Sequence, residues 1–201
     1  MQEVMKIKVL LDYCDDTKVF FRQRNNTIAE ELFAYLAFKI GIMLETIIFY
    51  TSFAQESDYK ILKTYHTKEM PVLNMKLFEI QHLILPQFIS IIESKLREWL
   101  QQKGYTKKDL LLCDILKCLY KNKLINQEQL HLWSGIRHIR NSSVHYNQYS
   151  KVTNTYKFTP KLILILKENK PISSNDLFQD FHLMQWMAKD IKKVLLKIYI
   201  H

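Results

Sequence analysis

The sequence predicts an all-α fold, an up-and-down bundle of about five helices in one domain spanning residues 1–201. Three observations support this. The chain has 201 residues, 48% of them apolar, which is enough for one substantial core. Only three glycines and four prolines interrupt it, and apolar residues recur at helical spacing along most of its length. No repeat, linker or low-complexity stretch divides the chain.

The first predicted helix begins at Thr27. Thr27 with Glu30 three residues later has the form of a capping box, and the apolar helix that follows runs to about Tyr50. Residues 1–26 are assigned no element and are treated as an N-terminal extension.

Residues 32–54 are apolar enough to suggest a membrane span. Lys39 and Glu45 lie in the middle of this stretch, however, and each costs about 2.5–3.5 kcal/mol in a bilayer. A buried helix of the bundle is therefore expected.

The middle of the chain predicts three more helices. A polar connection over residues 55–71 precedes a helix that begins near Asn74, bends at Pro86 and ends at Gly104. Thr106 with Asp109 repeats the capping-box pattern and starts a shorter helix with the apolar face Leu112, Ile115, Leu116 and Leu119. Asn126 with Gln129 caps the next helix, whose apolar side is Leu132, Ile136 and Ile139.

That helix is expected to break around residues 141–143, because Asn and Ser side chains compete for helical hydrogen bonds. Residues 153–167 then suggest a small β-hairpin or one short strand. Asn175 begins the final helix, over residues 175–201. Its apolar residues form a narrow seam for packing within the bundle or against a second subunit: Leu177, Phe181, Met184, Ala188, Ile191, Leu195 and Ile198.

The net charge of +9 is concentrated in one segment. Between Glu128 and Glu168 there is no acidic residue, and the segment carries six cations: Arg137, Arg140, Lys151, Lys157, Lys161 and Lys167. Two thirds of the net charge thus lies in 39 residues. A local excess of this kind is what a phosphate-binding surface needs.

The cysteines and the N-terminus indicate the compartment. Cys14, Cys113 and Cys118 lack the paired spacing of a zinc or redox site, so reduced core thiols are expected. Residues 1–11 carry three charges and no continuous apolar run, so no cleavable signal is predicted and cytoplasmic residence is expected.

Helix geometry decides which polar residues of the basic segment can meet. Asn141 and His145 are four residues apart and share a face, and His138 lies about two turns before His145 on nearly the same line. Arg140 lies roughly 140° away from His145 on a continuous helix. The two would therefore converge only across a helix break or in a symmetric dimer.

The pattern Arg140-Asn141-x-x-x-His145 in an all-helical chain resembles the HEPN superfamily, the higher eukaryotes and prokaryotes nucleotide-binding domain. Its signature is Arg, four to six residues, then His, commonly with a polar residue directly after the Arg. When an Asn is required directly after the Arg, the number of matches expected by chance in this chain falls to about 0.03. The helical likeness extends loosely over residues 74–147, which lead to the motif.

The resemblance implies a metal-independent endoribonuclease that cleaves single-stranded RNA at the cleft of a homodimer, acting as a toxin or an abortive-infection effector against phage. A cognate antitoxin, or another regulatory protein or RNA, is expected as a partner. In one toxin subgroup the residue modified by the antitoxin is a Tyr two residues after the His. Here Tyr146 follows His145 directly and position 147 is Asn, so the resemblance does not extend to that modification.

The residue types suit this chemistry. Cleavage without a metal needs a base for the 2′-hydroxyl, an acid for the leaving 5′-oxygen and a fixed cation for the phosphorane. His145 is the candidate acid or base, Arg140 the candidate phosphate ligand, and Asn141 the residue that orients the imidazole or binds the phosphate. Candidate substrate contacts are Arg137, His138, Ser142, Tyr146 and Lys151.

Other interpretations remain open. The arginines suit a solvated helix face, and His145 suits a core position, in a helical interaction protein or a non-catalytic HEPN-like module that binds nucleotides, RNA or protein. No cofactor is expected. No metal site is expected either, because His131, His138 and His145 are spaced by about 10.5 Å per step along a helix, too far apart to share one ion.

Overall fold

A computed structural model describes residues 2–56, 72–105, 110–145, 150–170 and 177–197. Helices form most of this part of the chain, and one antiparallel hairpin accompanies them, which confirms the predicted fold class. The elements are α1 (Gln2–Arg22), α2 (Thr27–Glu56), α4 (Val72–Gln102), α5 (Leu112–Lys121), α6 (Gln127–His145), β1 (Asn154–Thr159), β2 (Leu162–Leu166) and α7 (Leu177–Lys197).

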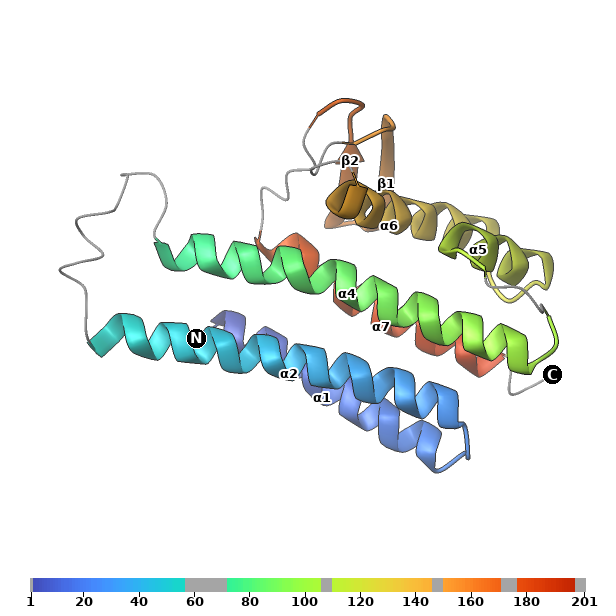
Figure 1. The fold of residues 1–201 in the computed structure, drawn as a ribbon, viewed down its shortest axis with the longest axis horizontal. Helices are drawn as coiled ribbons and strands as arrows, with labels where there is room; N and C mark the ends of the chain where they lie inside the picture. The colour runs from blue at the N-terminus through green and yellow to red at the C-terminus, as the bar shows by residue number, and fades with distance from the viewer. Residues whose placement is uncertain (1, 57–71, 106–109, 146–149, 171–176, 198–201) are drawn as a thin grey trace.

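The long helix α4 lies at the centre of the bundle and contacts α2, α5, α6 and α7. Figure 1 shows α1 and α2 as a helical hairpin on one side of α4, and α5 and α6 on the other. α7 runs behind α4, and the β-hairpin stands at the far side of α6. The bundle therefore holds α6, which carries the basic segment, directly against α4.

The structure places a helix where the sequence analysis assigned only an N-terminal extension. Helix α1 buries Ile7, Leu10, Cys14 and Phe21 against the rest of the core. Exposed apolar residues on its other side, such as Val9, blur the amphipathic pattern that would have revealed it. Residues 2–22 are thus part of the bundle.

The apolar seam of α7 packs within the chain's own bundle. Five of its residues are buried: Phe181, Met184, Ala188, Ile191 and Leu195. The side chain of Leu177 and the whole of Ile198 lie outside the described residues. Of the two alternatives for this seam, the structure favours bundle packing, and these five side chains do not present a face to a second subunit.

Capping hydrogen bonds and one glycine explain where three of the helices begin or end. Asn126 and Gln129 form the predicted capping box, in which each backbone N–H donates to the other's side-chain oxygen, at 3.1 and 2.8 Å. For α2 the cap is Asn26 rather than Thr27, because Asn26 Oδ1 accepts from the N–H of Ala29. Gly104 follows α4 with a φ of 74°, as predicted for a terminating glycine.

Two predicted features of the middle helices, Pro86 within α4 and the start of α5, can be compared with the structure. Helix α4 continues through Pro86, whose carbonyl accepts a hydrogen bond from Ser90 Oγ at 2.9 Å. Helix α5 begins at Leu112, after an extended Leu111 whose side chain makes no capping hydrogen bond. Thr106 and Asp109, the predicted cap, lie outside the described residues.

The segment near residues 153–167 is a hairpin, the first of the two predicted alternatives. Strands β1 and β2 pair antiparallel, with Tyr156 opposite Leu164 and Lys157 opposite Ile163. One face of the hairpin packs inward through buried residues: Tyr156, Phe158, Leu162 and Leu166. Its other face is exposed to solvent.

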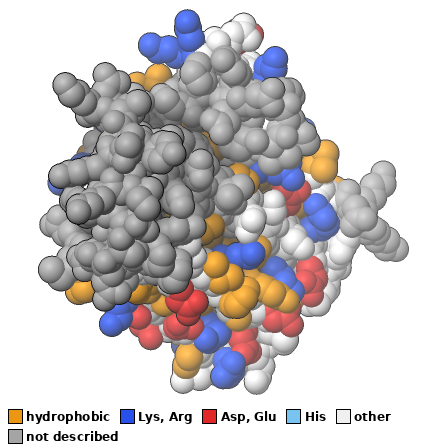
Figure 2. Space-filling view, turned by 60° about the vertical axis from the view of Figure 1, so that its left-hand side comes forward, with side chains coloured by type: hydrophobic (Ala, Val, Ile, Leu, Met, Phe, Trp, Pro, Cys, Tyr) orange, Lys and Arg blue, Asp and Glu red, His pale blue; other side chains and the backbone are white. Residues whose placement is uncertain are grey.

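No helix in the described part of the chain is long and apolar enough to cross a membrane. On the face shown in Figure 2, the coloured side chains mix basic and acidic groups around apolar ones. The described part of that face is therefore not a surface of one charge sign.

Candidate nucleic-acid interface

Helix α6 carries the predicted motif, and a buried carboxylate on α7 fixes its position. Asp190 is 7% exposed. Its Oδ2 accepts from the indole N–H of Trp133 at 2.8 Å, and its Oδ1 accepts from the amide of Gln129 at 2.9 Å. These two bonds tie the first turns of α6 to α7, and the capping box fixes where α6 begins. The rest of α6 therefore has a defined position in the bundle.

The expected break around residues 141–143 is wrong, because α6 continues to His145. The side chain of Asn141 accepts a hydrogen bond from Arg140 Nη1 at 3.2 Å. The amide oxygen of Asn141 is therefore engaged by a neighbouring cation and does not disrupt the backbone hydrogen bonds of the helix. On this continuous helix the backbone positions of Arg140 and His145 lie about 140° apart. Of the two proposed ways to bring them together, only pairing of two chains remains.

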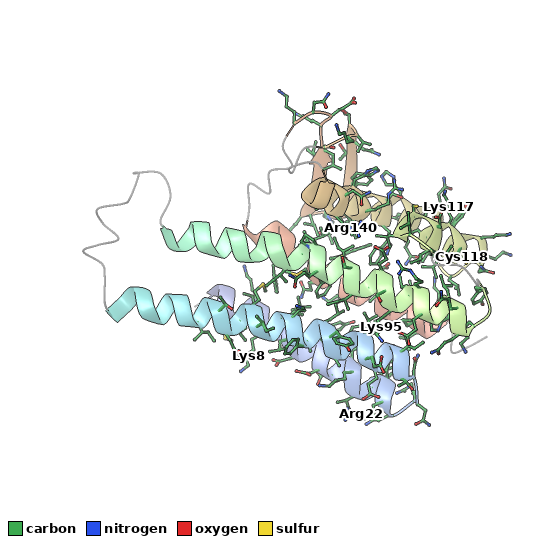
Figure 3. All side chains as sticks on the ribbon, viewed as in Figure 1. Lys8, Arg22, Lys95, Lys117, Cys118 and Arg140 are labelled. Atoms are coloured by element: carbon green, nitrogen blue, oxygen red, sulfur yellow. The ribbon has the colours of Figure 1, made fainter. Side chains whose placement is uncertain are left out.

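Arg140 reaches from α6 toward α4, as Figure 3 shows. Its Nη2 lies 3.9 Å from Oε2 of Glu93, whose side chain is only 7% exposed. The Arg140 side chain as a whole is 28% exposed. Its Nε is buried and has no hydrogen-bond partner in the described part of the chain.

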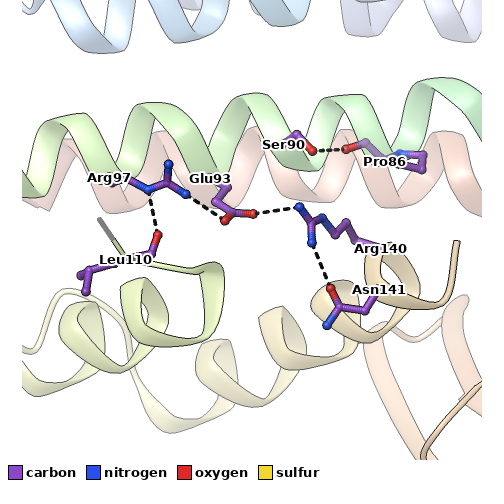
Figure 4. Close-up of polar contacts among 7 residues, drawn as sticks. All are labelled: Pro86, Ser90, Glu93, Arg97, Leu110, Arg140 and Asn141. Atoms are coloured by element: carbon purple, nitrogen blue, oxygen red, sulfur yellow. Dashed lines mark hydrogen bonds and ion pairs between the residues drawn. The ribbon is translucent and has the colours of Figure 1, made fainter. Parts of the chain in front are cut away.

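Arg97, one turn after Glu93 on α4, completes this arrangement (Figure 4). Its Nη2 donates to Glu93 Oε1 at 3.1 Å, and its Nε donates to the carbonyl oxygen of Leu110 at 2.8 Å. We call Glu93, Arg97, Arg140 and Asn141 the Glu93 cluster. It contains two guanidinium groups and one carboxylate, so it carries one positive charge in excess.

Arg137 and His138 form a second polar pair on α6. Arg137 Nη2 lies 3.4 Å from His138 Nε2. A guanidinium group can only donate, so the ring nitrogen accepts and the imidazole is neutral at this contact. Burial and then the charge of Arg137 lower the pKa of His138 below its usual value. Arg137 Nε is also buried without a partner among the described residues.

The basic hairpin packs against the same helix. The ring of Tyr156 lies over Gly135, and the ring centroids of Tyr156 and His131 are 4.7 Å apart. Burial raises the pKa of Tyr156, whereas its hydrogen bond to Asn154 and the charge of Arg137 act in the opposite direction. The four hairpin lysines are exposed: Lys151, Lys157, Lys161 and Lys167.

The structure thus brings only some of the predicted site residues together. Arg140 contacts Asn141, and Arg137 contacts His138, while Lys151 lies exposed at the base of the hairpin. Ser142 and His145 belong to α6, but their side chains lie outside the described part of the structure. Tyr146 lies outside the described residues altogether.

The sequence analysis missed Glu93 and Arg97. The basic segment is free of acids along the chain but not in space, because Glu93 comes from a helix 47 residues earlier. The only local signal was a Glu and an Arg at positions i and i+4 of α4, a pairing that is common on helix surfaces.

Comparisons with known proteins give no match: no protein-family model fits the chain, and no curated protein or solved structure is significantly similar to it. The resemblance to the HEPN superfamily therefore rests on the Arg140-Asn141-x-x-x-His145 pattern and the helical fold.

Proposed function

We propose that the protein is a metal-independent endoribonuclease of the HEPN type that cleaves single-stranded RNA. The observation that carries this proposal is the state of Arg140. It is held in place by Glu93 and Asn141, yet its side chain is 28% exposed and so is not fully enclosed by the bundle. A fixed guanidinium with spare donors is suited to binding a phosphate.

In the proposed reaction the 2′-oxygen of a nucleotide attacks the adjacent phosphorus, and the bond to the 5′-oxygen breaks. A base takes the 2′-hydroxyl proton, and an acid delivers a proton to the 5′-oxygen. The products are a 2′,3′-cyclic phosphate and a 5′-hydroxyl end. His145 is the proposed acid or base, and Arg140 binds the charged phosphorane.

The proposed active form is a homodimer, because one continuous α6 places Arg140 and His145 on different sides of the helix. In a two-fold pair of chains, Arg140 of one chain faces His145 of the other. The exposed lysines of the hairpin are expected to attract the RNA backbone, and Arg137, His138, Ser142 and Tyr146 are proposed as further substrate contacts.

The proposed biological role is that of a toxin or a phage-defence effector in the cytoplasm. Expression of the chain alone is expected to arrest growth, and His145→Ala is expected to relieve the arrest. A protein or RNA that masks the cleft, as an antitoxin does, is expected to restore growth as well. Growth that is unaffected by the wild-type chain would contradict this role.

The biochemical test uses a mixed pool of single-stranded RNA in the presence of a chelator. Wild-type protein is expected to cut the pool, while Arg140→Ala and His145→Ala are expected to lower the rate by at least about a hundredfold. Matched controls are Arg24→Ala in the turn between α1 and α2 and His182→Ala on α7, two exposed residues outside the basic segment. An intact pool after incubation with wild-type protein would overturn the proposal.

One observation favours a second candidate, a non-catalytic module that binds RNA, nucleotides or protein. Arg140 makes an ion pair with a buried carboxylate, which is also how a purely structural arginine behaves. In that case the wild-type chain binds RNA, the basic residues set the affinity, and no cleavage occurs.

A further inference from the structure

The geometry points to Glu93 as a positioning residue that holds the guanidinium group of Arg140 in the orientation needed to bind the scissile phosphate. This inference rests on the proposed function and extends it to a residue of α4 that lies outside the Arg-to-His motif.

The first argument is the burial of Glu93. A carboxylate that is 7% exposed is costly to bury unless cations and hydrogen bonds compensate it. Glu93 is the one carboxylate of the Glu93 cluster. Its Oε1 faces the guanidinium group of Arg97 and its Oε2 faces that of Arg140 (Figure 4). Its location fixes where the cation from α6 must lie.

The second argument is a difference between the two arginines. Arg97 is committed to Glu93 Oε1 at 3.1 Å and to the Leu110 carbonyl at 2.8 Å, so it serves as the anchor of the carboxylate. Arg140 approaches Glu93 only to 3.9 Å, beyond direct hydrogen-bond distance. Its contact is therefore one of charge attraction, which orients the group without saturating its donors.

The third argument is the charge of the cluster. One carboxylate cannot neutralise two guanidinium groups, and the acceptor on the other side of Arg140 is the neutral amide of Asn141. The excess positive charge thus lies on the arginine that is not anchored to the backbone. An RNA phosphate supplies the missing negative charge.

The test compares Glu93→Gln with Glu98→Gln, a control on the same helix that removes one of the two exposed carboxylate partners of Lys95. Glu93→Gln is expected to lower kcat by about tenfold to a hundredfold, because it loosens a group that acts in the transition state. KM is expected to stay the same or fall, since removing a negative charge cannot weaken attraction to RNA. Glu98→Gln is expected to leave both values unchanged.

A double-mutant cycle with Arg140→Lys separates positioning from general stability. Lysine keeps the charge but lacks the planar fork that Glu93 orients, so Glu93→Gln is expected to have little further effect on kcat in that background. The positioning role is overturned if Glu93→Gln lowers kcat by the same factor in the Arg140→Lys background as in the wild type. It is also overturned if Glu93→Gln alone turns over RNA as fast as the wild type. Either result leaves the ribonuclease proposal intact.

Failure of the proposed function gives a different result, because the wild-type chain then leaves RNA uncut. Where Glu93→Gln does not fold, Glu93→Asp replaces it. That variant keeps the charge but withdraws the carboxylate from Arg140 by one methylene group, and it is also expected to lower kcat with KM maintained. Wild-type kcat in Glu93→Asp would overturn the positioning role.

Discussion

The ring of Tyr156 on β1 lies so close to Gly135 on α6 that a Cβ at position 135 would stand 2.6 Å from the Cγ of the tyrosine. No side chain larger than hydrogen fits that gap without displacing the ring. Because Tyr156 is 2% exposed and belongs to the inner face of the hairpin, the hairpin has little room to move aside. Gly135 therefore determines how closely the basic hairpin approaches the helix of the candidate site.

We predict that Gly135→Ala lowers the free energy of unfolding by about 1–3 kcal/mol, the usual cost of overfilling a packed site. Urea titration measures this value. Gly41→Ala is the matched control, because Gly41 lies within α2 and a Cβ there would meet nothing within 4 Å. It is expected to raise stability by about 0.5–1 kcal/mol through better helix propensity. Equal effects of the two substitutions would contradict the close packing.

The sequence predicted the features of the fold that depend on local patterns. The capping box of Asn126 and Gln129, the glycine stop at Gly104 and the apolar face of α5 are short-range signals, and the structure confirms them. Helix α1 was missed because exposed apolar side chains such as Val9 obscure its buried face.

The candidate site was only partly predictable. The sequence pattern placed Arg140 and Asn141 on one helix, but nothing in the local sequence indicates that Arg140 reaches Glu93. The prediction of a helix break near Asn141 did not take into account that Arg140 donates a hydrogen bond to the Asn141 amide oxygen. Contacts between distant helices depend on how the whole bundle packs, and this information is not contained in a single helix pattern.

A second prediction concerns the two-chain site. Arg140→Ala and His145→Ala chains are each expected to be inactive, and co-expression is expected to restore about a quarter of the wild-type cleavage, since half of the dimers are mixed and each has one intact site. The specific activity of the co-purified mixture measures this. A mixture that stays as inactive as either variant alone would contradict a site shared between chains.

A third prediction is a pH dependence that comes from His138. Its pKa is lowered in the folded chain, so between that value and the ordinary value of 6.5 the unfolded chain binds more protons. Folding stability supported by neutral His138 is therefore present above pH 6.5 and decreases as the pH falls through this window. His138→Gln is expected to lose less stability than wild type between about pH 7.5 and pH 5.5 in urea titrations. Parallel losses in both chains would contradict it.

A fourth prediction distinguishes the three free thiols. Cys14 is buried, and burial raises its pKa to about 12, so it is expected to resist alkylation in the native chain. Cys113 and Cys118 are half-buried on α5 and are expected to react first. Mass spectrometry after iodoacetamide treatment, with and without urea, measures the order. Early native labelling of Cys14 would contradict the packing of α1 in the core.

The most direct test of the ribonuclease proposal compares a single-stranded RNA with its fully 2′-O-methylated counterpart in the presence of a chelator. The 2′-oxygen is the proposed nucleophile, so the wild-type protein is expected to cut only the unmodified strand. The fragments are expected to end in a 2′,3′-cyclic phosphate, and His145→Ala is expected to produce none. Cleavage of both strands, or of neither, would contradict the account.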